Sequence, residues 1–279
     1  MAPHPFISTP PPAGSIALTW INHASFLLQS SHGNFLIDPV YSDRCGPFGL
    51  FGPKRVHAPG VPIEELPTIH GVLLSHDHYD HCDLPTLRQL AKDYAPLAIT
   101  PLGNGDLLAR AGFRKVVELD WWTTHESSHP LRVTLTPSQH WSNRLSGARC
   151  SRLWGGFYLE FERCSIFFAG DTGYEPTLFK QIALRLGPPD CALLPIGAYE
   201  PRWFMKGQHC NPAEAVEIHR DLGARQSIAM HWGTFQLTDE AREDPPRALQ
   251  AALQQATISE DRFRVLDPGE TLVIARSPS

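Results

Sequence analysis

A short apolar segment leads directly into a run of histidines and aspartates at residues 71–81, which read GVLLSHDHYDH. The last six residues, His76 to His81, form an H-x-H-x-D-H motif. Imidazole nitrogens and carboxylate oxygens are the usual protein ligands of divalent metals. A wholly apolar strand that ends in such a loop places these side chains at one rim of a sheet. The motif therefore predicts a metalloenzyme rather than a polar surface loop that happens to contain histidines.

Three further candidate ligands each follow an apolar segment. His140 comes after residues 131–136, Asp171 after residues 165–169, and His231 after residues 227–230. Alone, either histidine would more often be a buried, hydrogen-bonded side chain, and Asp171 would more often be a turn residue. Because all three appear downstream of the H-x-H-x-D-H motif, we expect them to converge on the same site.

The size and composition of the chain set limits on its class. It has 279 residues, a 42% hydrophobic fraction and a formal net charge of -5. The length fits one large domain or two small ones, and we predict a Pro-rich arm over residues 1–14 and a single domain over residues 15–279. The absence of a basic block argues against a nucleic-acid partner.

Cysteine usage and the N-terminal sequence indicate the compartment. The six cysteines are scattered without a C-x-x-C pair, which argues against a zinc ribbon, a redox pair or an extracellular disulfide framework. Residues 1–14 lack the charged and apolar regions of a signal peptide, and no apolar run is long enough to span a bilayer. We therefore expect a cytoplasmic protein, and contact with a membrane surface stays open.

Short apolar strands occur in two sets, and each set is accompanied by helices. The first set is expected at residues 16–21, 26–29, 34–37, 72–74, 98–100, 116–118 and 131–136, with helices at 83–94, where Asp83 acts as the N-cap, and at 103–112. The second set is expected at 157–161, 165–169, 192–195, 227–230 and 272–275, with helices at 177–186, 247–255 and from the capping box Asn211–Glu214 to Gly223. This order favours an α/β protein with two packed sheets and helices outside, a four-layer αββα sandwich.

The order of these motifs resembles that of the metallo-β-lactamase-fold hydrolase superfamily. Five segments are also similar to the N-acyl-phosphatidylethanolamine-hydrolysing phospholipase D family: residues 118–122 (ELDWW), 136–141 (TPSQHW), 169–174 (AGDTGY), 195–208 (PIGAYEPRWFMKGQ) and 231–235 (HWGTF). The chain departs from that family at residues 20–24 (WINHA), where Ile-Asn replaces the usual Leu-Gly, and in the more apolar loop 46–53.

The resemblance implies an αββα sandwich with two zinc ions at its edge. One ion would be held by His76, His78 and His140. The other would be held by Asp80, His81 and His231, with Asp171 bridging the two. Asp80 and Asp171 would be the catalytic carboxylates. Iron and manganese accept the same ligand types, so other divalent metals stay open.

The resemblance also implies a function in lipid metabolism. We expect a zinc-dependent phosphodiesterase of phospholipase D type that hydrolyses N-acyl-phosphatidylethanolamine, or a related lipid, to phosphatidic acid and an N-acylethanolamine. The alternative is a hydrolase of the same fold with another substrate, such as a lactone, a β-lactam, a cyclic phosphodiester or RNA. A third hypothesis is a catalytically silent metal-binding module, and the complete set of candidate ligands argues against it.

Residues around the predicted centre are assigned more loosely. Asp38 and then Asp77 are candidates to orient the ligands, although Asp38 is equally well explained as a turn residue before Pro39. Tyr199, Arg202 and His209 are candidate substrate-binding residues, in a loop that can face the metal edge.

Apolar residues in two loops are candidates for contact with lipid. They are Phe48, Leu50 and Phe51, in a Gly/Pro-rich loop, and Trp203, Phe204 and Met205. The second group can instead close the core, and this is the interpretation that the sequence slightly favours. Trp121 and Trp122 are expected in the core or at a homodimer contact.

Overall fold

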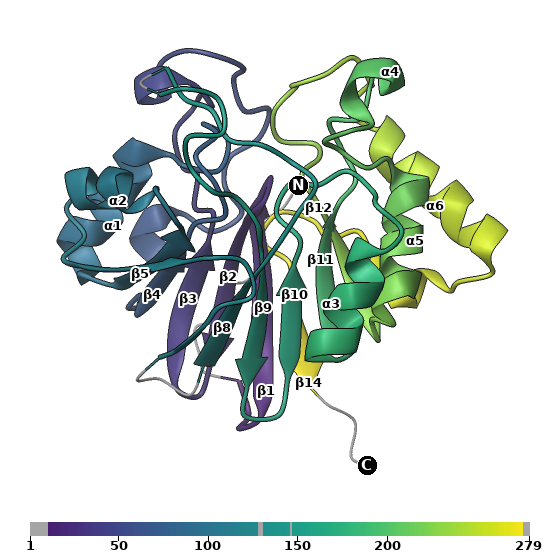
Figure 1. Ribbon diagram of the computed structural model, residues 1–279, viewed down its shortest axis with the longest axis horizontal. Coiled ribbons are helices and arrows are strands. Elements are labelled where there is room, and N and C mark those ends of the chain that lie inside the picture. Colours follow the sequence, from purple (N-terminus) through teal and green to yellow (C-terminus); the bar gives the residue numbers. More distant parts are fainter. Residues whose placement is uncertain (1–10, 128–130, 146, 276–279) are drawn as a thin grey trace.

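Two seven-stranded sheets pack face to face, and helices cover their outer faces (Figure 1). This arrangement is seen in a computed structural model that describes residues 11–127, 131–145 and 147–275. It confirms the predicted α/β four-layer sandwich. Most of the predicted N-terminal arm, residues 1–10, lies outside the described residues, and the division into an arm and one domain stays a prediction.

The first sheet is antiparallel at one side and parallel at the other. Its order is β14 (Thr271–Ala275), β1 (Ser15–Asn22), β2 (Ser25–Ser30), β3 (Gly33–Ile37), β4 (Gly71–Leu73), β5 (Leu97–Pro101) and β6 (Lys115–Leu119). Strands β3 to β6 run parallel. Their crossovers carry the helices α1 (Leu84–Tyr94) and α2 (Gly105–Ala111), which bury a separate apolar cluster against this sheet.

The second sheet has the same mixed character. Its order is β13 (Phe263–Arg264), β12 (Gln226–Met230), β11 (Cys191–Pro195), β10 (Ser165–Phe168), β9 (Gly156–Phe161), β8 (Leu131–Thr136) and β7 (Thr124–Glu126). It is accompanied by α3 (Leu178–Leu186), the short α4 (Arg202–Met205), α5 (Pro212–Leu222) and α6 (Asp244–Ala256). Three 3₁₀ turns complete the described elements: η1 (Pro47–Gly49), η2 (Ile63–Glu65) and η3 (Glu260–Arg262).

The central core lies between the two sheets. Wholly apolar strands such as β11 contribute side chains that are buried on both faces of the sheet, as expected for parallel strands covered by helices. Trp121 and Trp122 are half-buried against this core. The Trp121 indole donates to the Trp154 carbonyl, and the Arg185 guanidinium covers the Trp122 ring. The positions of Trp121 and Trp122 are therefore explained by packing against other residues of the same chain.

The predicted N-cap role of Asp83 is wrong in its detail. Asp83 occupies the N-cap position of α1, but its carboxylate makes no capping hydrogen bond. It accepts instead from the Ser42 amide (2.9 Å) and hydroxyl (2.8 Å). The carboxylate therefore anchors the loop that follows β3 to the start of α1, where Pro85 in the first turn has no amide to donate to a cap. None of the described helices is long and apolar enough to cross a membrane.

Candidate metal centre

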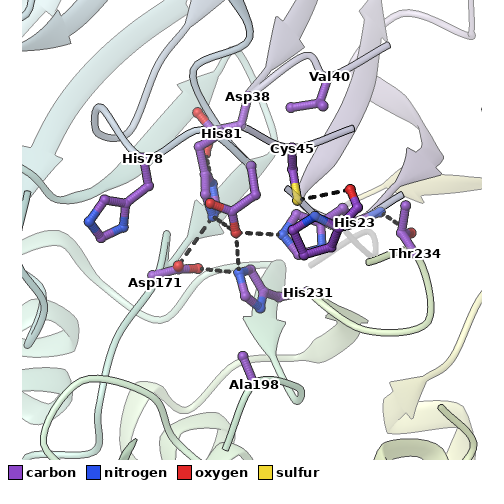
Figure 2. A network of polar contacts seen from close by, with 12 residues as sticks. His23, Asp38, Val40, Cys45, His78, His81, Asp171, Ala198, His231 and Thr234 are labelled. Carbon is purple, nitrogen blue, oxygen red and sulfur yellow. Dashed lines mark hydrogen bonds and ion pairs between the residues drawn. The ribbon is translucent and has the colours of Figure 1, made fainter. Parts of the chain in front are cut away.

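The candidate ligands gather where strands of both sheets end. The H-x-H-x-D-H loop follows β4, and β8, β10 and β12 each end just before another ligand. The carboxyl ends of neighbouring parallel strands share one edge of a sheet, which is the usual place for a binding site in such folds. Figure 2 shows His81, Asp171 and His231 pointing toward one another at this edge.

The first group of ligand atoms consists of His76, His78, His140 and Asp171. His78 Nδ1 lies 3.0 Å from His76 Nε2 and 3.1 Å from His140 Nε2. Asp171 Oδ2 lies 3.6 Å from His140 Nε2 and 3.8 Å from His76 Nε2. A tetrahedral ion with bonds of about 2.0–2.1 Å requires ligand separations of about 3.3 Å. The four atoms therefore fit around one divalent ion.

The second group consists of Asp80, His81, His231 and the same Asp171. His81 Nε2 lies 3.2 Å from Asp171 Oδ2 and 3.6 Å from Asp80 Oδ2. His231 Nε2 lies 3.1 Å from Asp171 Oδ1 and 3.3 Å from Asp80 Oδ2. Among the described residues, the two Nε2 atoms and Asp171 Oδ1 are buried without a hydrogen-bond partner. Buried polar atoms are rarely left this way unless a further ligand completes them.

The electrostatics of the centre favour cations. Burial alone would raise the pKa values of Asp80 and Asp171, but the surrounding imidazoles hold both well below the usual range of a carboxyl. Burial alone would lower the pKa of His231, but Asp171 and Asp80 outweigh it and raise that pKa to about 9. A bound metal would take the place of the proton on such an imidazole.

The outer nitrogens of two ligands are held by hydrogen bonds. Asp38 Oδ2 accepts from His81 Nδ1 at 2.7 Å, and the Gln208 carbonyl accepts from His140 Nδ1 at 3.0 Å. Each bond places the proton on the outer nitrogen, so the Nε2 lone pair faces the centre. Asp38 is thus hydrogen-bonded to the candidate ligand His81, which is the contact expected of a residue that orients a ligand.

Asp77 behaves differently from Asp38. Its carboxylate accepts from the Asn143 amide at 2.8 Å and lies 3.5 Å from the Arg152 guanidinium. These contacts hold the loop after His140, and they correct the expectation that Asp77 contacts a ligand imidazole. The carboxylate faces that loop because Asp77 lies between His76 and His78, whose rings turn to the other side, toward the metal centre.

The predicted substrate-binding residues have different environments. The His209 ring is buried, with its centroid 5.0 Å from that of His140 and 5.4 Å from that of His231. Tyr199 is also buried. Arg202 lies on α4, where its guanidinium pairs with Glu214 at 2.7 Å and donates to the His209 carbonyl at 2.9 Å. This arrangement favours a structural role for Arg202 over binding of a phosphate.

Two apolar residues beside Arg202 correct the core interpretation. Trp203 and Phe204 are 86% and 60% exposed, and only Met205 is buried. A four-residue helix at the molecular edge can bury only one of its faces, so the other two side chains face solvent.

The sequence did not single out His23 as a site residue. Its Nε2 lies 3.0 Å from Asp80 Oδ2, and its ring centroid lies 4.0 Å from that of His231. Burial lowers the pKa of His23 to about 3, so the ring is neutral. His23 follows a strand, as the other candidate ligands do, but it sits in a tight hairpin turn more than fifty positions before the motif. The only signal was a histidine at a turn where glycine or asparagine is usual.

Two packed mixed sheets with a cluster of histidines and aspartates at one edge define a metal-dependent hydrolase of the β-lactamase type. Residues 33–232 match the family model described as "Beta-lactamase superfamily domain", and the chain belongs to this family. The relatives are hydrolases, and so is this chain.

Two relatives and one solved structure illustrate the similarity. The chain is 36% identical to N-acyl-phosphatidylethanolamine-hydrolyzing phospholipase D 1 of Caenorhabditis elegans, over 90% of this chain and 74% of that protein. It is 36% identical to the mitochondrial N-acyl-phosphatidylethanolamine-hydrolyzing phospholipase D of Saccharomyces cerevisiae, over 83% of this chain and only 50% of the yeast protein. The isothiocyanate hydrolase from Delia radicum gut bacteria has the same fold, with a TM-score of 0.72, 22% identity, and coverage of 92% and 98% of the two chains.

Proposed function

We propose that this chain is a zinc-dependent phosphodiesterase of phospholipase D type. The substrate would be N-acyl-phosphatidylethanolamine or a related lipid, and the products phosphatidic acid and an N-acylethanolamine. The observation that carries the proposal is the pair of ligand groups that Asp171 connects through its contacts with His140, His81 and His231, in a chain with two relatives named for this activity. Among the alternatives, hydrolysis of a non-lipid substrate by the same centre remains the second candidate.

The chain would contribute geometry and charge to such a reaction. Two divalent ions bound here would supply the positive charge that lowers the pKa of a water molecule and neutralises an anionic phosphoryl oxygen. Asp171 and Asp80 offset only part of that charge, so the centre keeps an attraction for the single negative charge of a lipid phosphodiester. Asp38 holds the His81 imidazole in the tautomer that presents Nε2 to the centre.

The surface around the centre supports a lipid substrate. We define the apolar rim as Phe48, Leu50 and Phe51 of the η1 loop together with Trp203 and Phe204 of α4. These side chains are 60–86% exposed. The η1 loop (indigo) and α4 project from opposite sides of the same end of the molecule in Figure 1. Exposed apolar residues on such loops favour contact with a membrane, a partner or an apolar ligand.

Hydrolysis in ¹⁸O-labelled water tests this function. Purified protein loaded with zinc would be assayed on N-acyl-phosphatidylethanolamine, a cyclic phosphodiester, a lactone and a β-lactam. We expect turnover of the phospholipid, with the label in phosphatidic acid, because the site suits attack on phosphorus. Label in a free fatty acid would show carboxylester cleavage. Turnover of only a non-lipid substrate would favour the second candidate.

A further inference from the structure

His23 occupies a strained position at the turn between β1 and β2. Its backbone φ is 44°, in the left-handed region that few residues other than Gly, Asn, Asp and His adopt, and its side chain is buried. A bulky residue is kept in such a conformation only when the surrounding structure requires it, and such outliers often mark functional sites.

Backbone hydrogen bonds fix this turn against the other sheet. The His23 amide donates to Thr234 Oγ1 at 2.8 Å, and the His23 carbonyl accepts from the His231 amide at 3.0 Å. The same carbonyl accepts from the Trp20 indole at 2.9 Å. The hairpin of the first sheet is therefore tied to the segment of the second sheet that carries His231.

The ring of His23 reaches one particular oxygen of the candidate centre. Its Nε2 lies 3.0 Å from Asp80 Oδ2, the atom that also faces His81 Nε2 and His231 Nε2 at 3.6 and 3.3 Å. The neighbouring rings of His231 and Phe235 pack against the imidazole, with centroid separations of 4.0 and 5.4 Å. The ring consequently has little freedom to move away from Asp80.

The hydrogen bonding of Nε2 separates His23 from the candidate ligands beside it. His23 Nε2 lies within reach of the same ion as Asp80, His81 and His231. It is nevertheless already hydrogen-bonded to Asp80 Oδ2, whereas the Nε2 atoms of His81 and His231 have no hydrogen-bond partner among the described residues. An Nε2 that carries a proton can donate to Asp80 but has no lone pair left for a metal.

We propose that His23 is a positioning residue that donates its Nε2 proton to Asp80 Oδ2 and holds that carboxylate toward His81 and His231. It sets the geometry of the second ligand group without being a ligand itself. The proposal rests on the metal centre of the proposed function, but it does not depend on the lipid substrate.

Metal binding by His23→Leu and His23→Gln tests the proposal without any substrate. The Leu and Gln side chains meet similar backbone strain at φ 44°, so a difference between these two variants reports the hydrogen-bond donor and not the turn. Affinity for each ion would be measured by competition with a chromophoric chelator, and the visible spectrum of the cobalt-substituted protein would report the geometry of the second ion. His23→Leu should weaken binding of the second ion by about 10- to 100-fold and alter the spectrum. His23→Gln should recover most of both, because its amide donor can reach Asp80.

Two further variants guard against misfolding. In His23→Asn the new side chain suits the left-handed backbone but is too short to reach Asp80. This variant should therefore weaken binding of the second ion as His23→Leu does. His219→Leu removes another buried histidine, which lies on α5 and pairs with Ser227 Oγ at 2.8 Å. This variant should leave both ions bound.

Two results would overturn the proposal. Wild-type affinity and spectrum in His23→Leu would show that Asp80 does not need the donor. A loss in His23→Gln as large as in His23→Leu, with one imidazole fewer by X-ray absorption, would make His23 a ligand. If the metal data hold but the phospholipid is not hydrolysed, only the proposed function fails.

Discussion

Asp171 is the residue on which both ligand groups depend, because its oxygens face His140 on one side and His81 and His231 on the other. We expect wild-type protein to bind two divalent ions per chain. Asp171→Asn should bind fewer than one and lose more than about 100-fold in turnover, because removal of the shared carboxylate damages both sites. Elemental analysis after gel filtration, together with initial rates, checks this expectation.

The matched control for that variant is Asp261→Asn, which makes the same chemical change at an exposed position in η3. It should keep both metals and full activity. The fold of Asp171→Asn should persist, because the core between the sheets does not include this side chain. Two tightly bound ions in Asp171→Asn would contradict the bridging role.

Asp38 acts on the centre through His81, so its replacement should have a smaller and more selective effect. Asp38→Asn removes the charge that accepts from His81 Nδ1, while asparagine tolerates the left-handed backbone at this position, where φ is 41°. We expect the second ion to bind about 10- to 100-fold more weakly, with the first ion little affected. Chelator competition measures both. Equal weakening of the two ions would mean that Asp38 also acts on His76 through the Ser75 hydroxyl, which contacts Asp38 Oδ2 and lies 2.9 Å from His76 Nδ1.

For single residues, the sequence predicted the candidate ligands that follow an apolar strand downstream of the H-x-H-x-D-H motif. It missed His23, which lies in a hairpin turn far upstream of that motif. His140, Asp171 and His231 each follow an apolar strand, so strand order alone brings them together. His23 reaches the centre only because the β1–β2 turn packs on the segment after β12. The ion pair that occupies Arg202 likewise depends on how α4 docks against α5.

Among the helices, α5 shows how a local signal can be read directly from the chain. The predicted capping box is confirmed: the Asn211 side chain accepts from the Glu214 amide at 2.9 Å, and the Glu214 carboxylate accepts from the Asn211 amide at 3.0 Å. Glu214 also pairs with Arg202, so the start of α5 helps to hold the segment that carries His209.

Asn211→Ala should therefore lower the free energy of unfolding by about 1 kcal/mol, the usual cost of losing an N-cap side chain. Urea unfolding followed by circular dichroism provides the measurement. Gln255→Ala, at an exposed position of α6, should change it by less than about 0.5 kcal/mol. A loss in Asn211→Ala no larger than in this control would show that water replaces the cap.

Long elements with a clear apolar pattern were predicted to within a few residues, and so was the three-residue β4, whose residues are wholly apolar, whereas three other short elements were not predicted. Strands β7 and β13 and helix α4 have only three, two and four residues. Segments this short have too little hydrogen bonding of their own and form because neighbouring strands or loops are already in place. Their positions are set by tertiary packing rather than by local sequence.

For the whole molecule, the sequence predicted the four layers but not which apolar loops would find partners. It also assigned two strands to the wrong set, because residues 131–136 (β8) lie in the second sheet and residues 272–275 (in β14) lie in the first. Two sets of strands with intervening helices can bury their apolar faces only by stacking sheet on sheet. Whether Trp203 and Phe204 close the core depends on the docking of α4, and hydrophobicity alone favoured the wrong answer. Their exposure adds to the apolar surface that the η1 loop presents to solvent, so both loops can contribute to contact with lipid.

Replacement of Phe48, Leu50 and Phe51 by Ser should weaken liposome binding and activity on a bilayer substrate, because transfer of these side chains into lipid would be lost. Trp203→Ser with Phe204→Ser should act in the same direction from the other loop. Hydrolysis of a short, water-soluble phosphodiester should survive in both variants, since the candidate ligands are untouched. Co-sedimentation with phospholipid vesicles and parallel assays on the two substrates give the comparison.

Leu184 supplies the matched control for the apolar rim. It is 86% exposed on α3, outside the two loops that form the rim, so Leu184→Ser removes equally exposed apolar surface without touching them. This variant should bind vesicles as the wild type does. Equal losses on both substrates in a rim variant would mean that its loop supports the structure of the site. Undiminished binding with both loops changed would mean that the bilayer meets another face, and the apolar rim would then have no role in substrate entry.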